Sequence, residues 1–305
     1  MTHYEILIVG GGPAGYTAAL YAARSGRKTA VVEKLSPGGQ MATTSVIDNY
    51  PGFPDGVDGF ELGEKMEQQA RKYGAETVYA EVTGADLTAV PKVLHTSEGD
   101  LTADAVILTT GAYPRELGLP GESELRGRGI AYCAACDGMM YRGKVVAVNG
   151  GGNTAVEDAL YLSKLCSKVY LIHRRDSLRA SAVYHKALEE AGIEIVWNSR
   201  VTALRKEKRL TGIELENVVT GEKSELACDG LFVAVGRVPD TALFAGQVET
   251  DNAGYLVADE SCRTSVPGVF AAGDVRTKAL RQVITAAADG ATAAHWAEEY
   301  LLKRV

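Results

Sequence analysis

Hydrophobic and polar positions along the chain predict alternating strands and helices. Residues 4–9 form an apolar run that predicts a buried strand, and a glycine-rich segment follows it directly at 10–15. An alanine-rich stretch from 16 to about 24 predicts a helix, and the apolar run at 29–33 predicts a second strand. This order of strand, glycine turn, helix and strand is typical of a dinucleotide-binding unit with parallel strands.

The glycine turn of this unit has glycine where the backbone needs it. Gly10 permits the tight turn, Gly12 lets a pyrophosphate approach the backbone, and Gly15 lets the helix pack closely on the sheet. Glu33 ends the second strand, where its carboxylate is placed to accept hydrogen bonds from ribose hydroxyls. An ordinary turn without a ligand is the alternative, and the complete strand–turn–helix context argues against it.

The same order recurs 140 residues later in the chain. A strand at 145–148 leads into a second glycine turn at 150–155, a helix extends to about 166, and a strand follows at 169–172. The first helix carries Ala-Leu-Tyr at 19–21, and the second repeats it in the same register at 159–161. The chain therefore predicts an α/β fold with two homologous, Rossmann-like dinucleotide-binding domains.

The two copies differ at the end of their second strand. Where the first copy has Glu33, the second has His173, which is followed by Arg174, Arg175 and Arg179. Replacing a carboxylate by guanidinium groups exchanges a site for a 2′-hydroxyl for one that fits a 2′-phosphate. We expect FAD in the first domain and NADPH, rather than NADH, in the second. A solvated basic turn is the alternative for the arginine cluster.

Later segments predict that the second domain is inserted into the first. Apolar runs at 105–111 and 231–236 each predict a strand that ends at a glycine and closes its own domain. A third run places Asp274 just after a buried strand, and a long alanine-rich helix opens at 281–283. Both features suit the FAD domain, because a helix N-terminus favours anionic groups.

These boundaries define a discontinuous FAD domain and an inserted NADPH domain. The FAD domain is expected at 1–113 and 240–305, and the NADPH domain at 114–239. The chain crosses between them near Tyr113-Pro114 and Pro239-Asp240, where proline stiffens the backbone.

Composition and charge narrow the class of protein. A chain of 305 residues with 46% hydrophobic and 23% charged positions is typical of a globular protein of about two domains. The net charge of −7 argues against general affinity for nucleic acid or an anionic membrane. No apolar run approaches the roughly 20 residues of a spanning helix, and the N-terminus lacks the pattern of a signal peptide. We expect a cytoplasmic protein.

Two of the five cysteines, Cys133 and Cys136, form a close pair. The other three are widely scattered, which makes a poor disulfide framework for a reducing compartment. A Cys-x-x-Cys pair is a zinc half-site, an inert structural pair or a reversible disulfide. The remaining cysteines and histidines lack zinc-ligand spacing, so we expect no metal and favour redox chemistry. Asp137 follows directly and is placed to shuttle the proton that thiol–disulfide exchange requires, although it could also be a helix cap.

Taken together, these motifs resemble the low-molecular-weight, bacterial-type thioredoxin reductases, which are class II pyridine nucleotide-disulfide oxidoreductases. The resemblance runs from Ile6 to Leu301. The matching segments are Gly10–Gly15, Gly38-Gly39-Gln40, Asn49-Tyr50-Pro51-Gly52, Thr110-Gly111-Ala112, Cys133–Gly138, Gly150–Ala155, His173-Arg174-Arg175 with Arg179, and Ala272-Gly273-Asp274.

The resemblance implies a homodimer in which NADPH reduces FAD, FAD reduces the Cys133–Cys136 disulfide, and the dithiol reduces thioredoxin. It implies that Cys136 lies nearer the flavin, that Cys133 attacks the thioredoxin disulfide and that Asp137 supplies the acid. It also implies a rotation of the inserted domain, because the dithiol and the nicotinamide site share that domain and alternate at the flavin.

The motifs and the resemblance together assign the residues that bind each nucleotide. For FAD they are Gly10, Gly12, Pro13, Ala14, Gly15, Glu33, Gly39, Gln40, Thr43, Asn49, Thr110, Gly111, Gly273, Asp274, Arg281, Gln282 and Val283. For NADPH they are Gly150, Gly152, Asn153, Thr154, Ala155, His173, Arg174, Arg175 and Arg179.

Three alternatives and one partner hypothesis accompany this interpretation. The same chemistry could serve another acceptor, namely a glutaredoxin-like protein, a peroxidase subunit or a small dithiol. A ferredoxin-linked relative would lack the arginines, and a non-enzymatic redox sensor would not need Asp137. The chain departs from the family pattern at Ala135, often a larger residue, and at Asn149, usually an apolar one. Arg126 and Arg128 precede the dithiol and are hypothesised to steer an acidic rim of thioredoxin, or else to be solvated loop charges.

Overall fold

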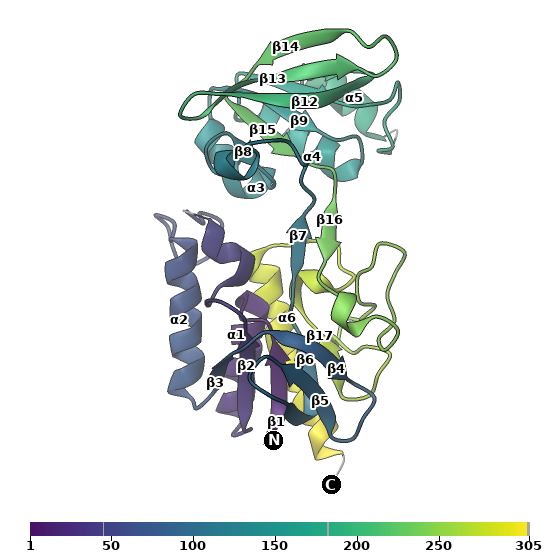
Figure 1. Cartoon of the computed structure of the whole chain (residues 1–305). Helices are drawn as coiled ribbons and strands as arrows, with labels where there is room; N and C mark the ends of the chain where they lie inside the picture. Colours follow the sequence, from purple (N-terminus) through teal and green to yellow (C-terminus); the bar gives the residue numbers. More distant parts are fainter. Residues whose placement is uncertain (45, 182, 304–305) are drawn as a thin grey trace. The chain divides into compact units, whose positions relative to one another are not determined.

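The computed structural model describes residues 1–44, 46–181 and 183–303, which divide into two compact units. Unit 1 is built from Met1–Tyr113 and Val238–Val305, and unit 2 from Pro114–Arg237. Each unit has its own central sheet with parallel strands and its own helices (Figure 1). The α/β fold class predicted from the sequence is confirmed.

Unit 1 is organised around a sheet in the order β3-β2-β1-β6-β5-β4, with β17 also paired to β6. Strands β1, β2, β3, β6 and β17 are parallel, whereas β4 and β5 are antiparallel additions at one edge. Its strands are β1 (Thr2–Val9), β2 (Thr29–Glu33), β3 (Glu76–Tyr79), β4 (Val82–Asp86), β5 (Lys92–Thr96), β6 (Leu101–Leu108) and β17 (Val269–Ala271). Its helices are α1 (Pro13–Arg24), α2 (Gly59–Lys72) and α6 (Val283–Leu302), with short 3-10 turns η1 (Gly39–Thr43), η4 (Ala242–Phe244) and η5 (Gly273–Val275).

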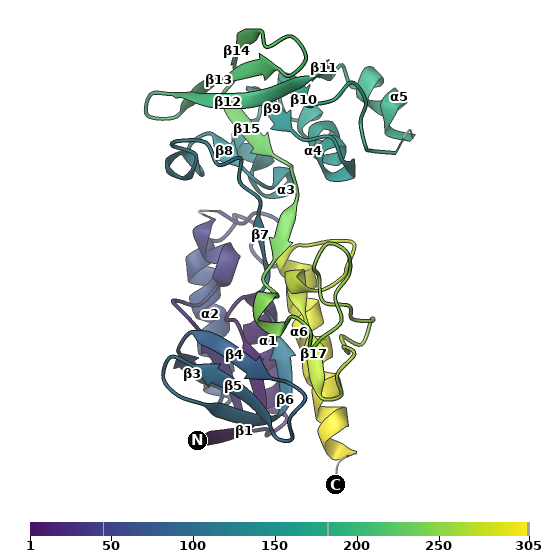
Figure 2. The ribbon, with the colours of Figure 1, turned by 45° about the vertical axis from the view of Figure 1, so that its right-hand side comes forward.

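The core of unit 1 follows from the alternation of side chains along its buried strands. Ile6 and Ile8 point to the face covered by α1 and α6, while Leu7 and Val9 point to the opposite face, against Phe244. The small alanines of α1 and α6 let these two helices pack directly on one another and on the sheet (Figure 2). A near-continuous apolar run such as 6–9 is typical of a strand buried on both faces.

Unit 2 repeats the arrangement with a sheet in the order β11-β10-β9-β15-β8. A separate three-stranded antiparallel sheet, β12-β13-β14, belongs to the same unit. The strands are β8 (Ile130–Ala131), β9 (Val145–Asn149), β10 (Lys168–Ile172), β11 (Glu194–Val196), β12 (Ser199–Lys206), β13 (Leu210–Asn217), β14 (Lys223–Ala227) and β15 (Gly230–Val233). The helices are α3 (Ala134–Asp137), α4 (Asn153–Ser163) and α5 (Val183–Glu190), with 3-10 turns η2 (Ser123–Leu125) and η3 (Gly138–Tyr141).

The internal repeat seen in the sequence has the same topology in both units. In unit 1, β1 lies between β2 and β6, and in unit 2, β9 lies between β10 and β15. Three predicted ends were wrong. The strand expected at 105–111 ends at Leu108, before Gly111, which has a positive φ of 78°. The strand expected to reach Gly236 ends at Val233, because the chain turns away and Gly236 adopts a positive φ of 108°. The helix expected to reach about Cys166 ends at Ser163.

The chain passes between the units in two short strands, β7 (Ala112–Pro114) and β16 (Arg237–Pro239), which pair with each other. No helix in the described ranges is both long and apolar enough to cross a membrane.

Candidate functional site

The first glycine turn connects β1 to α1 through backbone contacts that leave no room for a side chain. Gly10 has a φ of 105°, and a Cβ atom on it would lie 2.7 Å from the carbonyl oxygen of Thr109. A Cβ atom on Gly15 would lie 1.9 Å from the carbonyl oxygen of Gly10. The start of α1 therefore packs directly on the turn, in the way that the glycine spacing predicted.

Gly12 has a different environment, because a Cβ atom placed on it would meet no atom within 4 Å. It precedes α1, whose first residue is Pro13, so the unpaired N–H groups of the first helical turn lie beside this open space. Gly39 of η1 lies close to this turn, because a Cβ atom placed on Gly39 would lie 3.3 Å from the Cα atom of Gly12. Open space next to a helix N-terminus is what an anionic phosphate requires, and the residues present fit FAD at this point.

The carboxylate of Glu33 is fixed at the end of β2 by two backbone donors. Its Oε2 atom accepts from the N–H of Gly11 at 2.7 Å, and its Oε1 atom accepts from the N–H of Leu35 at 3.0 Å. A Cβ atom on Gly11 would lie 2.9 Å from Oε2 and 3.0 Å from the ring of Tyr16, so both side chains pack closely on this glycine. Sequence analysis did not single out Gly11.

The ends of β6 and β17 lie next to this turn, because both strands are parallel to β1 through the sheet. Thr109, directly after β6, donates its hydroxyl to the carbonyl oxygens of Val9 and Gly10 at 2.8 Å. Thr110 donates to the carbonyl oxygen of Asp240 at 2.5 Å. Gly273 follows β17, and a Cβ atom on it would lie 3.0 Å from that of Ala14 in α1. Asp274 is thereby placed at the same carboxyl edge as the glycine turn.

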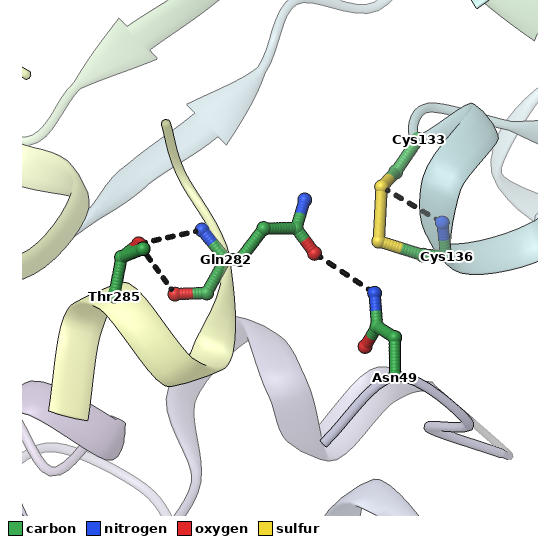
Figure 3. The surroundings of a disulfide bond; sticks show 5 residues. All are labelled: Asn49, Cys133, Cys136, Gln282 and Thr285. Atoms are coloured by element: carbon green, nitrogen blue, oxygen red, sulfur yellow. Dashed lines mark hydrogen bonds between the residues drawn. A yellow bond between two sulfur atoms is a disulfide. The ribbon is translucent and has the colours of Figure 1, made fainter. Parts of the chain in front are cut away.

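Asn49 and Gln282 are joined by a hydrogen bond of 3.0 Å from Asn49 Nδ2 to Gln282 Oε1 (Figure 3). Gln282 caps α6 in a capping box with Thr285, whose hydroxyl oxygen accepts from the Gln282 N–H at 3.1 Å. Arg281 stacks over the ring of Tyr255, 4.0 Å from its centroid, and its Nε donates to the Asp274 carbonyl at 3.4 Å.

All the residues assigned to FAD therefore belong to unit 1. They lie on the glycine turn, at the carboxyl ends of β2, β6 and β17, in η1, on the loop that carries Asn49, and at the start of α6. Gln40 and Thr43 belong to η1, and Val283 is the first residue of α6. Gly111 adds a left-handed position with φ of 78°.

The second glycine turn has the same construction in unit 2. A Cβ atom on Gly150 would lie 2.4 Å from the carbonyl oxygen of Ala234, while one on Gly152 would meet no atom within 4 Å. Gly152 precedes α4, whose first residues are Asn153 and Thr154. Ala155 takes the place of Gly15, and its methyl group is fully buried against the turn. The open position at Gly152 again lies beside a helix N-terminus and fits a phosphate.

His173 occupies the position of Glu33 and lies directly over Gly151. A Cβ atom on Gly151 would lie 2.1 Å from the imidazole ring, so only glycine is accommodated there. Burial lowers the pKa of His173, and the nearby arginines lower it further. A backbone hydrogen bond at Ser177 acts in the opposite direction but does not outweigh them, so the ring is neutral near pH 7. Within the described part of the chain, its Nε2 atom is buried without a hydrogen-bond partner.

Arg174, Arg175 and Arg179 are exposed around this buried ring. The segment folds back on the glycine turn, because the backbone N–H of Arg179 donates to the Gly151 carbonyl at 2.7 Å. Three guanidinium groups next to a helix N-terminus suit a 2′-phosphate better than a 2′-hydroxyl.

Cys133 and Cys136 form a disulfide in unit 2 (Figure 3). Cys133 caps the four-residue helix α3, and its Sγ atom accepts from the N–H of Cys136 at 3.2 Å. The N–H of Asp137 donates to the Cys133 carbonyl at 3.0 Å. Both sulfurs are half-buried, so the bond is reachable while its backbone frame is fixed. Because the sulfurs are bonded to each other, neither is a thiolate ligand in this state.

The turn after the disulfide packs tightly on α4. A Cβ atom on Gly138 would lie 2.9 Å from the ring of Tyr161. Tyr141 is buried against Phe232 in an edge-to-face contact, and burial, followed by the charge of Asp137, raises the pKa of its hydroxyl. Asp137 is half-buried between the disulfide and this packed turn.

Asp158 is a carboxylate near the disulfide that sequence analysis missed. It lies on α4 and accepts a hydrogen bond from the N–H of Ala134, the first residue of α3. Burial, and then the charge of Glu157, raises its pKa to about 6, while the Ala134 N–H and Arg237 act in the opposite direction. Its position between alanine and glutamate in a helical stretch gives no sequence signal for this contact.

Comparisons with known proteins agree over the whole chain. The family model of pyridine nucleotide-disulphide oxidoreductases matches residues 4–290. The chain is 46% identical to a thioredoxin reductase of Treponema pallidum (strain Nichols), covering 98% of both chains, and 47% identical to one of Streptomyces clavuligerus, covering 97% of this chain and 94% of the other. It is also similar to the crystal structure of thioredoxin reductase from Streptococcus pyogenes MGAS5005, with a TM-score of 0.91, 41% identity and 99% of each chain covered.

Proposed function

The chain belongs to the pyridine nucleotide-disulphide oxidoreductase family, and from this membership we propose that it is an NADPH-dependent thioredoxin reductase that carries FAD. The observation that carries the proposal is the half-buried Cys133–Cys136 disulfide, held in the same unit as the arginine-flanked glycine turn. A disulfide at Cys-x-x-Cys spacing, capped on its own short helix, is suited to reversible exchange.

Unit 1 holds FAD in this proposal. The N–H groups at the start of α1 and the open space at Gly12 receive its pyrophosphate, Glu33 its adenosine ribose, and Asp274 a hydroxyl of its ribityl or phosphate part. When bound, FAD accepts two electrons from NADPH and delivers them to the disulfide.

Unit 2 selects NADPH. Gly152 and the start of α4 receive the pyrophosphate, and Arg174, Arg175 and Arg179 pair with the 2′-phosphate. The buried His173 ring, whose pKa is lowered by burial and by the nearby arginines, packs under this site and adds no charge to it.

The dithiol performs the exchange with thioredoxin. Two electrons and two protons convert the Cys133–Cys136 bond into two thiols. Cys133 passes its proton to the Asp137 carboxylate and attacks one sulfur of the thioredoxin disulfide as a thiolate; a mixed disulfide forms, and the displaced sulfur leaves as a thiolate that takes the proton back from Asp137. Cys136 then attacks the Cys133 sulfur, which restores the internal disulfide, and the proton that Cys136 loses passes to the second thioredoxin sulfur as it leaves.

Arg126 and Arg128, the two arginines hypothesised to steer thioredoxin, differ in the structure. Arg126 is committed to Glu116 at 2.9 Å and stacks over Tyr132. Arg128 is exposed and lines a surface hollow with Lys206 and Lys208 and with Glu124 and Glu207, and Lys206 is paired with Glu124. We therefore assign the greater part of the steering of an acidic partner to Arg128.

We also propose that the enzyme is a cytoplasmic homodimer. Unit 1 has a groove between α1, α2 and α6. Apolar side chains line much of it, and two of them, Tyr21 and Ile284, are exposed; the others include Leu20, Tyr50, Met66 and Ala287. A second copy of this chain would cover these side chains, and an exposed apolar face of this kind is typical of protein interfaces. Sedimentation of the purified protein tests this assembly.

An anaerobic titration of the purified flavoprotein tests the function. NADPH is expected to bleach the flavin spectrum at stoichiometric amounts, while NADH does so at far higher concentration; Arg174→Ala with Arg175→Ala should remove this difference. Thioredoxin thiols, followed with a chromogenic disulfide, should then appear. A preference for NADH, or transfer to a small dithiol but to no thioredoxin, would contradict the proposal.

A further inference from the structure

A single buried carboxylate, Asp289 of α6, collects four hydrogen bonds from three residues. Arg276 donates from Nε to Oδ2 at 2.9 Å and from Nη2 to Oδ1 at 3.1 Å. Lys278 donates to Oδ2 at 2.8 Å, and the backbone N–H of Gly273 donates to the same oxygen at 3.0 Å. Of these residues only Gly273 is assigned to the FAD site, and the proposed chemistry uses none of the three charged side chains.

The cluster has one defined arrangement because its charges are buried. Burial alone would raise the pKa of Asp289, but the hydrogen bonds from Arg276 and Lys278 outweigh it and hold the pKa below its ordinary value. The side chains of Arg276 and Lys278 are each only 7% exposed. Buried ions must stay paired, so moving any of the three side chains is costly.

The cluster connects two segments that follow β17 and are assigned to the flavin site, namely the Gly273-Asp274 loop and the start of α6. At one end, the Gly273 N–H fixes the loop that contains Asp274. At the other end, Lys278 donates to the carbonyl oxygen of Thr285 at 3.2 Å. Thr285 forms the capping box with Gln282, the residue that accepts from Asn49. One carboxylate thus controls both the loop and the start of α6.

Gly290, the residue after Asp289, brings α6 against the first turn of α1, which is also assigned to the flavin site. A Cβ atom on Gly290 would lie 2.2 Å from the carbonyl oxygen of Ala14, in the first turn of α1. Consecutive residues of α6 therefore contact the glycine turn on one side and the Gly273 loop on the other. This arrangement makes α6 the common support of the flavin-facing backbone.

We propose that Asp289 is a positioning residue of the flavin site, which sets the loop at Gly273-Asp274 and the capped start of α6 in the geometry that retains FAD. The proposal rests on the proposed function, since it requires that unit 1 binds FAD. Asp289 acts through Gly273, Arg276 and Lys278, to which all four of its hydrogen bonds run.

Three variants of the full-length holoenzyme test the proposal. Asp289→Asn keeps the size of the side chain but removes the charge that pairs two cations. Lys278→Met removes one cation and leaves Asp289 balanced by Arg276, so it should fold even if the first variant does not. The matched control is Glu5→Gln, which loses a half-buried carboxylate in the middle of β1 that pairs with Arg27, away from the carboxyl end of the strand.

The readout is the rate at which FAD fluorescence appears on warming, at temperatures where far-ultraviolet circular dichroism is unchanged. We expect release about tenfold faster or more in Asp289→Asn and several-fold faster in Lys278→Met, where tenfold corresponds to about 1.4 kcal/mol. Glu5→Gln should release FAD within about twofold of the wild-type rate.

Two outcomes would overturn the proposal, and they are distinguishable. In the first outcome, the wild-type protein carries FAD, and the Lys278→Met variant and every folded Asp289→Asn preparation retain it as tightly as the wild type. Asp289 then has no positioning role. If the wild-type chain binds no FAD at all, the proposed function fails first and the inference fails with it.

Discussion

Asn49 donates a hydrogen bond to Gln282 across a sequence separation of 233 residues, and Gln282 is the cap of the longest helix in unit 1. The bond links the loop after η1 to the start of α6, so a cap that would otherwise act only locally also carries a tertiary contact. Helix caps and tertiary contacts are normally provided by different residues, and here one side chain serves both.

Gln282→Ala should therefore lower the free energy of unfolding by more than Asn49→Ala. Loss of the capping box costs about 1 kcal/mol, whereas an exposed neutral hydrogen bond contributes about 0.5 kcal/mol. Urea denaturation followed by tryptophan fluorescence measures both. Equal effects of the two substitutions would show that the capping contribution of Gln282 is negligible.

Cys133→Ser with Cys136→Ser should abolish thioredoxin reduction and leave flavin reduction by NADPH intact. The reason is that the two thiols act only after FAD has received its electrons. Stopped-flow absorbance reports the first step, and a thioredoxin thiol assay reports the second. Residual thioredoxin turnover above about 1% of wild type would require another thiol route.

Gly152→Ala and Gly151→Ala should separate nucleotide binding from folding. At Gly152 there is room for the new methyl group, so the variant should keep its melting temperature but lose NADPH affinity by about 100-fold, because the methyl group occupies the pyrophosphate position. At Gly151 the methyl group meets the His173 ring, so this variant should lose about 2 kcal/mol or more of stability. Calorimetry and NADPH titration of both proteins check the pair, and the reverse pattern would refute the assignment.

Asp158 should make stability depend on pH in a definite direction. Its pKa is raised from 3.8 to about 6 in the folded protein, so its stabilising contribution is present below about pH 3.8 and is lost as the pH rises through 6. The loss amounts to about 3 kcal/mol at most, from about 1.36 kcal/mol for each pKa unit. The difference in unfolding free energy between Asp158→Asn and wild type should thus increase between pH 4 and pH 7. Parallel curves for the two proteins would mean that Asp158 titrates normally.

Arg128→Ala should slow thioredoxin reduction at low ionic strength and flatten its salt dependence. Arg126→Ala is the matched control, because Arg126 already has Glu116 as its partner. Steering by one exposed charge changes association several-fold, and salt screens the effect. Thioredoxin kinetics from low to physiological salt check this expectation. Identical salt profiles for the two variants would argue that neither arginine meets the partner.

The elements and turns that the sequence predicted correctly depend on local chemistry. Gly10, Gly12 and Gly15 sit at fixed spacing between a strand and a helix, and Gly10 and Gly15 have the close backbone contacts expected of them, while the pyrophosphate contact expected at Gly12 stays a prediction. The second copy could be recognised because the same spacing returned in the same register. Such features involve neighbours within a few residues and are readable from a single chain.

Contacts between distant segments were not predictable in this way. Gly11 donates its N–H to Glu33, which lies 22 residues later, and Gly273 donates to Asp289, which lies 16 residues later and inside an alanine-rich helix. Nothing in the composition of that helix indicates that one carboxylate is buried and paired with two cations. The strand predicted to continue to Gly236 failed for a related reason, since apolar residues persist after the backbone has turned.

The ring of His173 over Gly151 and the carboxylate of Glu33 over Gly11 have a consequence for how nucleotide preference is encoded. In both units the residue at or just after the end of the second strand rests on the middle glycine of the turn, and the glycine before each helix has a similar extended backbone, with φ of −78° at Gly12 and −93° at Gly152. The glycine leaves room for either a carboxylate or an imidazole side chain above it. Exchanging that side chain together with the adjacent surface charges alters which nucleotide is bound, while the fold of the unit stays the same.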